Sequence, residues 1–242
     1  MSAGEITVLL AAVLVAATTQ MVAGFGFALL AVPLMSTALD THLAVVVTTA
    51  LGLVTSAAQA WNGRRDTERV LAKRMTLAAF AGMPFGLLVF TQVNERVLRL
   101  LLGVCVLVVV VLLARRIDLR HAGPRLDWTA GAISGALSTS LSTNGPPLVF
   151  ALQARHLSPH VFRPTINTVF AVSGVVTLSA FAIAGEVEAE TLRAVALSIP
   201  ALLAGLGLGI SLRGHVDGER FRGLVLVLLS VAAFGAIVAA VA

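Results

Sequence analysis

The feature that most constrains the fold of this chain is a succession of long stretches that are almost free of charged residues. They occupy residues 6–39, 41–63, 75–94, 100–114, 128–154, 164–185, 194–212 and 223–242. A helix of roughly 20 apolar residues crosses the hydrocarbon core of a bilayer, which is about 30 Å thick. Charged residues form only 12% of the chain, about half of their share in soluble domains. The sequence therefore predicts an all-α integral membrane protein.

A weak internal repeat divides the chain into two halves. Positions offset by 123, 117 or 114 residues carry the same residue type: Gly82 and Gly205, Gly86 and Gly209, Thr48 and Thr165, Ser56 and Ser173, Pro33 and Pro147. We expect two membrane repeats, residues 1–126 and 127–242, and interpret the glycine pairs as helix-packing faces. Each repeat has an interrupted segment (5–39, 127–155) and then three spans: 41–61, 75–94 and 97–114 in the first, and 162–185, 191–212 and 221–242 in the second.

Both interrupted segments contain helix-breaking residues near their centres. The stretch LSTNGPPL, residues 141–148, breaks the second segment, and the stretch AGFG, residues 23–26, breaks the first. The pieces 127–141 and 146–155 would form helices of about 22 and 15 Å, so neither would cross the bilayer alone. We expect each interrupted segment to form a re-entrant hairpin, while two full crossings per segment remain compatible with the sequence.

The distribution of Lys and Arg favours an inverted arrangement of the two repeats. If the interrupted segments are hairpins, fourteen of these residues fall on one side of the membrane and three on the other. If each segment is a single crossing, the division is ten against seven. Cytoplasmic loops carry an excess of Lys and Arg, so the hairpin arrangement gives inverted-topology repeats with both termini outside the cytoplasm.

The second break predicts a helix that starts at membrane depth. Ser142, Thr143 or Asn144 can cap that helix, Gly145 permits the turn, and Pro146 suits the first helical turn. The N-terminus of a helix presents free N–H groups and a partial positive charge, and both attract anions. Transporters use broken helices of this kind to build substrate sites. We therefore expect a site for a small anion at this break.

The first break and two spans supply the remaining candidates for this site. Gly24, Phe25 and Gly26 form the first break, and in an inverted repeat the two breaks would face each other across the centre. The candidates from the spans are Thr48, Arg163, Thr165 and Asn167. Hydroxyl groups also bond to their own helix and arginines extend toward the interface, so Thr48 and Arg163 equally fit structural roles. Gln20 fits either role.

Several other functions lack the residues that they need. No P-loop is present, the five histidines show no metal-ligand spacing, and one cysteine cannot form a disulfide or a cysteine-based metal site within the chain. The hydroxyl residues of the spans have no His, Asp or Lys beside them to activate a nucleophile. Basic residues lie in short loops and do not form one soluble face. We expect no enzyme, no cofactor, no metal and no nucleic-acid partner.

Four stretches of the chain resemble the TauE/SafE family of sulfite and sulfonate exporters. They are AGFGFALLAVPLM, HLAVVVTT, SGALSTSLSTNGPPLVFAL and FRPTINTVFAVSG, and the order of spans agrees over nearly the whole chain. The resemblance implies a multi-pass permease of the bacterial inner membrane that exports sulfite or small organosulfonates. The family pattern is richer in glycine at both breaks. Here Ser138, Ser140, Ser142 and Asn144 stand where glycines are expected, which leaves the particular substrate open.

The break residues and the resemblance together predict a secondary transporter for a small oxyanion. We expect the anionic group to bind between the two breaks near the bilayer midplane, with Gly24, Gly26, Asn144, Gly145 and Pro146 shaping the seat. A channel-like anion conductor and a permease for another small carboxylate or oxyanion remain alternatives. The sequence also leaves open a homodimer, because the glycine-bearing faces fit packing within one chain or against a second subunit.

Overall fold

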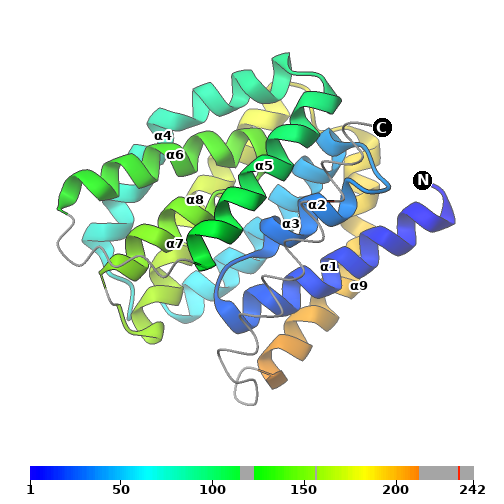
Figure 1. Cartoon of the computed structure of the whole chain (residues 1–242). Coiled ribbons are helices and arrows are strands. Elements are labelled where there is room, and N and C mark those ends of the chain that lie inside the picture. The colour runs from blue at the N-terminus through cyan, green and yellow to red at the C-terminus, as the bar shows by residue number, and fades with distance from the viewer. Residues whose placement is uncertain (115–122, 156, 213–233, 235–242) are drawn as a thin grey trace.

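The computed structural model describes residues 1–114, 123–155, 157–212 and 234 (Figure 1). This part of the chain folds into helices and contains no strand: α1 (Ala3–Ala23), α2 (Phe27–Met35), α3 (Thr41–Asn62), α4 (Arg69–Gln92), α5 (Glu95–Ala114), α6 (Pro124–Leu141), α7 (Gly145–Ala154), α8 (Pro159–Ile183) and α9 (Ala189–Leu212). Helices α1, α3, α4, α8 and α9 are long and apolar enough to cross a membrane. The protein is an all-α integral membrane protein. The expected last span, 221–242, lies outside the described residues.

Local sequence signals set several helix ends. At the start of α1, Ser2 and Glu5 form a reciprocal capping box, and α1 ends where Gly24 adopts a left-handed conformation with φ of 88°. Asp40 caps α3 by accepting a hydrogen bond from the Leu43 N–H at 3.0 Å. Pro124 occupies the first turn of α6, where no amide donor is needed.

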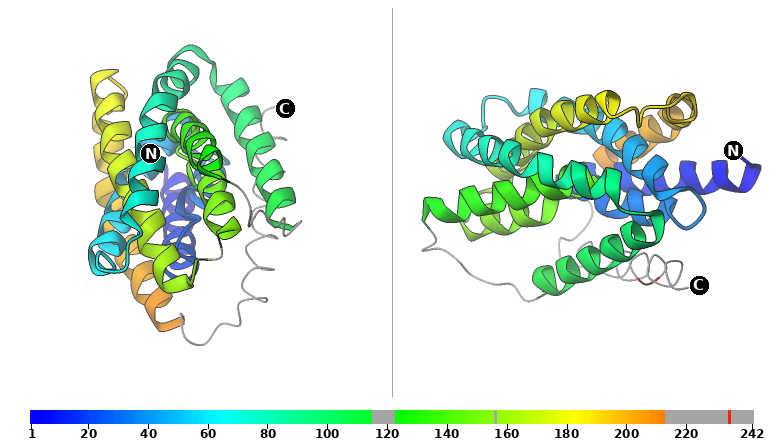
Figure 2. Two further views of the ribbon diagram at one scale, coloured as in Figure 1. Left: turned by 90° about the vertical axis from the view of Figure 1, so that its left-hand side faces the viewer. Right: turned by 90° about the horizontal axis from the view of Figure 1, so that it is seen from above.

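Three long helix pairs organise the molecule. Helix α1 lies along α9, α4 lies along α6, and α3 packs on α8 between them (Figures 1 and 2). A Cβ atom on Gly82 or Gly86 of α4 would overlap the backbone oxygen of Ala132 or Ala136 in α6. On α9, a Cβ on Gly205 would lie 2.7 Å from the Leu14 oxygen of α1, and one on Gly209 would lie 2.9 Å from the Thr18 oxygen. The interpretation of these glycines as packing faces is confirmed.

Each interrupted segment folds back on itself at its break. Helix α2 runs back along α1 and α7 runs back along α6 (Figures 1 and 2). The short arms α2 and α7 have 9 and 10 residues, whereas α1 and α6 have 21 and 18. At 1.5 Å per residue α1 spans about 31 Å and α6 about 27 Å. The first arm of each hairpin is thus longer than the arms expected from the sequence.

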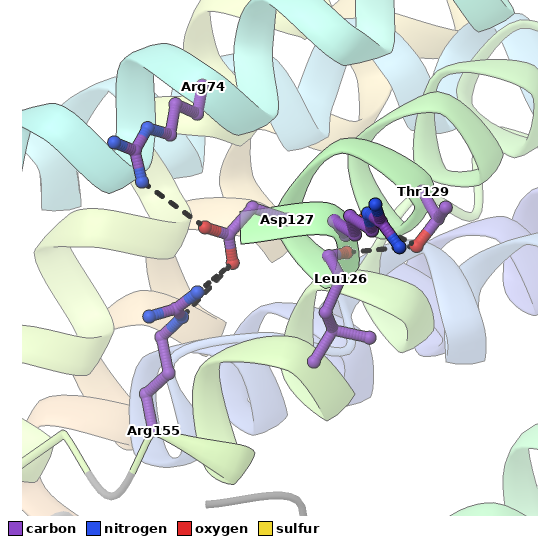
Figure 3. Close-up of polar contacts among 6 residues, drawn as sticks. Arg74, Leu126, Asp127, Thr129 and Arg155 are labelled. Carbon is purple, nitrogen blue, oxygen red and sulfur yellow. Dashed lines mark hydrogen bonds and ion pairs between the residues drawn. The ribbon is translucent and has the colours of Figure 1, made fainter. Parts of the chain in front are cut away.

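A buried ion cluster lies in the first turn of α6. Asp127 is fully buried and accepts hydrogen bonds at Oδ1 from Arg155 Nε at 3.0 Å and Nη2 at 2.6 Å. Arg74 Nη1 of α4 lies 3.8 Å from Asp127 Oδ2, and Figure 3 shows the two arginines approaching different oxygens. Helix α6 begins at Pro124, three residues before Asp127, at which the predicted hairpin began. The ion cluster ties the base of the α6–α7 hairpin to α4.

Candidate functional site

A central cavity lies between the two breaks. Helices α1, α2, α3, α6, α7 and α8 all contribute to its lining, together with Ser142, Thr143 and Asn144 of the second break. The space open to the centres of water-sized molecules is about 40 Å³. One water needs roughly 10–15 Å³ on this measure, so the cavity has room for a few waters or a small oxyanion. The described residues that line it are all uncharged.

The structure brings five of the predicted site residues to this cavity. They are Gly26, Thr48, Thr143, Asn144 and Gly145. Thr48 and Thr143 are fully buried, and Thr143 Oγ1 donates to the Leu141 oxygen at 2.9 Å. Thr48 Oγ1 has only a long contact of 3.7 Å to the sulfur of Met35. The other predicted site residues surround the cavity without lining it.

The start of α2 presents backbone donors to the cavity. Gly26 is its N-cap, with φ of 102°, a left-handed conformation that favours glycine. The first backbone bond of the helix runs from the Leu30 N–H to the Gly26 oxygen at 3.2 Å, and no side chain caps the turn. Phe27, Ala28 and Leu29 line the cavity, and N–H groups in a first turn have no acceptor within their helix. The first turn of α2 therefore presents a positive electrostatic potential to the cavity.

The start of α7 supplies fewer donors than the sequence interpretation assigned to it. Pro146 and Pro147 have no N–H group, which leaves the amides of Asn144 and Gly145 at the start of this helix. Ser142 does not cap α7, because it closes α6 in a left-handed conformation with φ of 55°. The Asn144 backbone oxygen accepts a hydrogen bond from Ser134 Oγ at 2.8 Å. Of the two breaks, the first is the richer source of N–H groups.

Each break is held by a long helix from the other half of the chain. The Oγ atoms of Thr49 in α3 and Ser142 in the second break are hydrogen-bonded at 2.9 Å. Because the single hydroxyl proton of Thr49 goes to the Val45 oxygen at 2.8 Å, Ser142 donates and Thr49 accepts. Asn167 Nδ2 of α8 donates to the Gly24 oxygen of the first break at 2.8 Å. These two crossed contacts fix the breaks around the cavity.

Asn167, Arg163 and Thr165 support the first break and its surroundings. Arg163 Nη2 donates to the Val22 oxygen at 2.9 Å, at the C-terminal end of α1, where a cation opposes the helix dipole. Thr165 Oγ1 accepts from the Glu68 N–H at 2.9 Å and donates to the Val161 oxygen at 2.7 Å. These contacts lie behind the cavity, so Arg163 and Thr165 have structural contacts in this structure.

Phe25 and Pro146 also have packing positions. The ring of Phe25 contacts that of Phe162 edge to face, with centroids 6.3 Å apart. Pro146 is buried in the first turn of α7. Neither residue lines the cavity.

Four hydroxyl groups that line the cavity were not among the predicted site residues, although the sequence showed Ser138 and Ser142 at the second break. Thr49, Ser56, Ser138 and Ser142 are all buried there, and so is the amide of Gln20. One signal was available in α3, where Thr48, Gly52 and Ser56 recur every four residues on one helix face. Gln20 stands alone in its helix, and only its neighbours in space reveal its position.

The comparisons with known proteins agree with this architecture. A search of curated proteins and a search of solved structures found no match. The family model described as sulfite exporter TauE/SafE matches residues 9–235, which is nearly the whole chain. The chain therefore belongs to the TauE/SafE family of sulfite exporters, multi-pass membrane transporters of a small anionic substrate.

Proposed function

We propose that the protein is a secondary transporter that exports sulfite, an organosulfonate or a similar small oxyanion from the cytoplasm. The observation that carries this proposal is the uncapped first turn of α2, which lies against a cavity whose described lining residues are all uncharged. Oriented N–H groups in such a place stabilise negative charge. The substrate binds with its oxygens toward Phe27, Ala28 and Leu29 and toward Gly145 of α7.

One hydroxyl group adds a donor to this site. Ser56 Oγ accepts a hydrogen bond from Gln20 Nε2 at 3.1 Å. Ser56 therefore keeps its own proton for a ligand oxygen. A site built from dipoles without a fixed cation binds an anion firmly enough to select it and weakly enough to release it.

The helix contacts support the proposed inverted repeats, residues 1–126 and 127–242. The first arm of each hairpin packs on the second span of the other half, α1 on α9 and α6 on α4. The first spans of the two halves, α3 and α8, pack on each other in the centre. Exchanging the two halves therefore reproduces the pattern of contacts. This symmetry is what alternating access about a central site requires.

Ion pairs between connections support the proposed orientation in the bacterial inner membrane. The Met1 amino nitrogen lies 3.9 Å from Glu190 Oε1, and both residues are on the proposed periplasmic side. His160 Nε2 lies 3.1 Å from Asp66 Oδ1, and both are on the proposed cytoplasmic side with most of the Lys and Arg residues. With this orientation both chain ends are periplasmic.

The membrane potential is sufficient to drive the proposed export. It contributes about 2.3 kcal/mol per charge per 100 mV and expels anions from a negative interior. None of the described residues that line the cavity is acidic, so none of them can act as a proton relay.

The test is flux into liposomes that contain the purified protein. We expect labelled sulfite to enter faster than into protein-free liposomes, with a rate that saturates and responds to an imposed potential. Ser56→Ala removes a cavity donor and should weaken apparent affinity by roughly 2–10-fold, the usual worth of one hydrogen bond. Ser198→Ala is the matched control, because Ser198 is also buried and, among the described residues, bonds only the Ala194 oxygen of its own helix. Absence of flux for sulfite, sulfonates and small carboxylates would overturn the proposal, and a rate that never saturates would indicate a channel.

A further inference from the structure

A chain of amides fixes the orientation of Gln20 at the cavity. Asn167 Nδ2 lies 2.8 Å from the Gly24 carbonyl oxygen and 2.9 Å from the Arg163 carbonyl oxygen. Carbonyl oxygens only accept, so the NH₂ group of Asn167 must occupy this position and its Oδ1 must turn toward Gln20. Because Asn167 Oδ1 also only accepts, the atom of Gln20 that lies 3.2 Å away is Nε2.

This orientation leaves one unpaired acceptor and one unpaired donor beside each other. The second hydrogen of Gln20 Nε2 goes to Ser56 Oγ at 3.1 Å, so Ser56 keeps its own proton. Gln20 Oε1 accepts no hydrogen bond from any residue that the structure describes. Gln20 and Ser56 are 2% and 3% exposed, and both line the cavity. Both atoms are therefore available to a polar group inside the cavity, either water or a bound ligand.

The donor and the acceptor together match the edge of a protonated acid group. An oxygen of the ligand can accept from Ser56 while a hydroxyl of the ligand donates to Gln20 Oε1. An oxyanion without a hydrogen would place an oxygen against Gln20 Oε1, where both atoms are acceptors. The N–H groups of α2 remain available for the other oxygens of either ligand.

We propose that Gln20 is a specificity-determining residue, which makes the cavity select a singly protonated oxyanion over one that offers acceptors alone. This inference rests on the proposed function, because it requires an anion in this cavity. For sulfite, the form that binds is then hydrogen sulfite.

Methylphosphonate and methanesulfonate provide a matched pair of probes. At a pH where methylphosphonate is singly protonated, both ions have one methyl group, three oxygens and one negative charge. They differ in the central atom, phosphorus or sulfur, and in the one proton that only methylphosphonate carries. Affinities follow from thermal stabilisation of the detergent-purified protein at increasing ligand concentration. We expect methylphosphonate to bind at least about five-fold more tightly, because methanesulfonate leaves Gln20 Oε1 unpaired. Gln20→Met should bring the two affinities to within about two-fold.

Two controls separate this effect from general damage. Ser56→Ala leaves Asn167 to hold Gln20, so both affinities should fall while the preference remains. Ser198→Ala should change neither affinity. If Gln20→Met does not fold, the parent protein still provides a test. Raising the pH removes the methylphosphonate proton, which should weaken methylphosphonate binding and leave methanesulfonate binding unchanged.

Three outcomes would overturn the inference alone: equal affinity of the parent for the two ions, a preference that survives Gln20→Met, or methylphosphonate binding that does not weaken as the pH rises. In each case the anion site itself would stand. If sulfite and both probes fail to stabilise the parent protein, the proposed function fails together with the inference.

Discussion

Asn167 and Gly24, which lie 143 positions apart in the sequence, are joined by a 2.8 Å hydrogen bond from the side-chain amide to the backbone oxygen. The bond connects α8 of one half to the first break of the other half. Asn167 also accepts a hydrogen bond from the side-chain amide of Gln20, which in turn donates to the hydroxyl of Ser56. One fully buried residue thus determines both the position of a break and the polarity of the cavity wall.

Asn167→Asp tests this double role with almost no change in shape. The substitution removes the NH₂ group that donates to two carbonyl oxygens, so oxygen faces oxygen. We expect the free energy of unfolding to fall by about 1–3 kcal/mol, the cost of buried polar groups without partners, and anion stabilisation to be lost. Melting in detergent with and without sulfite measures both effects. Thr168→Val is the control, because among the described residues Thr168 Oγ1 bonds only the Pro164 oxygen in its own helix. Equal melting temperatures for the two variants would contradict the prediction.

Three glycine-to-alanine changes separate backbone strain from steric overlap. Gly26 has φ of 102° with its nearest outside atom, Thr19 Cγ2, at 3.6 Å, so alanine introduces backbone strain alone. Gly24 has φ of 88°, and a Cβ there would also lie 2.6 Å from Arg163 Cγ. Gly207 lies within α9, and a Cβ atom there would have no described neighbour within 4 Å.

We expect Gly26→Ala to cost about 1–2 kcal/mol from left-handed backbone strain and Gly24→Ala to cost more. Gly207→Ala should be neutral or stabilise by up to about 1 kcal/mol, because alanine favours helix. The order of the three melting temperatures is the measurement. A Gly26→Ala protein as stable as Gly207→Ala would show that the left-handed conformation of the first break is not required.

The Asp127 cluster gives a prediction about stability that is independent of transport. Asp127→Asn leaves the Arg155 guanidinium without its charged partner, and breaking a buried ion pair costs about 3–5 kcal/mol. Replacing both partners, as Asp127→Leu with Arg155→Met, removes the unpaired charge and should recover much of this loss. Arg74→Gln should cost less, because Arg74 is 42% exposed and its nitrogen lies 3.8 Å from the carboxylate. Thermal unfolding of the four proteins checks this order. A double variant less stable than Asp127→Asn would contradict it.

The sequence predicted the helices and the breaks because the signals for both are local. Apolar length identifies spans, and the glycines and prolines of 23–26 and 141–148 mark the breaks wherever the segments pack. The predicted hairpin began at Asp127, whereas α6 begins three residues earlier, at Pro124. A charge reads as the end of an apolar segment unless its partners are known, and the partners of Asp127 are the distant Arg74 and Arg155. No rule based on one segment anticipates such a pairing.

The cavity was only partly predictable for the same reason. Gly26, Thr48, Thr143, Asn144 and Gly145 lie at or beside the breaks, and they line the cavity. The contact between Gln20 and Asn167 spans 147 positions and depends on the packing of α1 near α8. The larger number of amides at α2 could have been deduced, since Pro146 and Pro147 lack N–H groups in α7.

Those two prolines also lead to a prediction about affinity. Pro147→Ala adds an N–H group to the first turn of α7, and its side chain has room because Pro147 is half-buried. The new donor strengthens the positive end of α7 beside the cavity, so an anion should bind about 2–10-fold more tightly, the worth of one hydrogen bond. The protein without ligand should be less stable by about 0.4–1 kcal/mol, because proline restricts the unfolded chain. Sulfite-dependent melting separates the two effects, since the starting temperature falls while the ligand-induced rise increases. A smaller ligand-induced rise than in the parent would show that the amides of α7 do not face the bound anion.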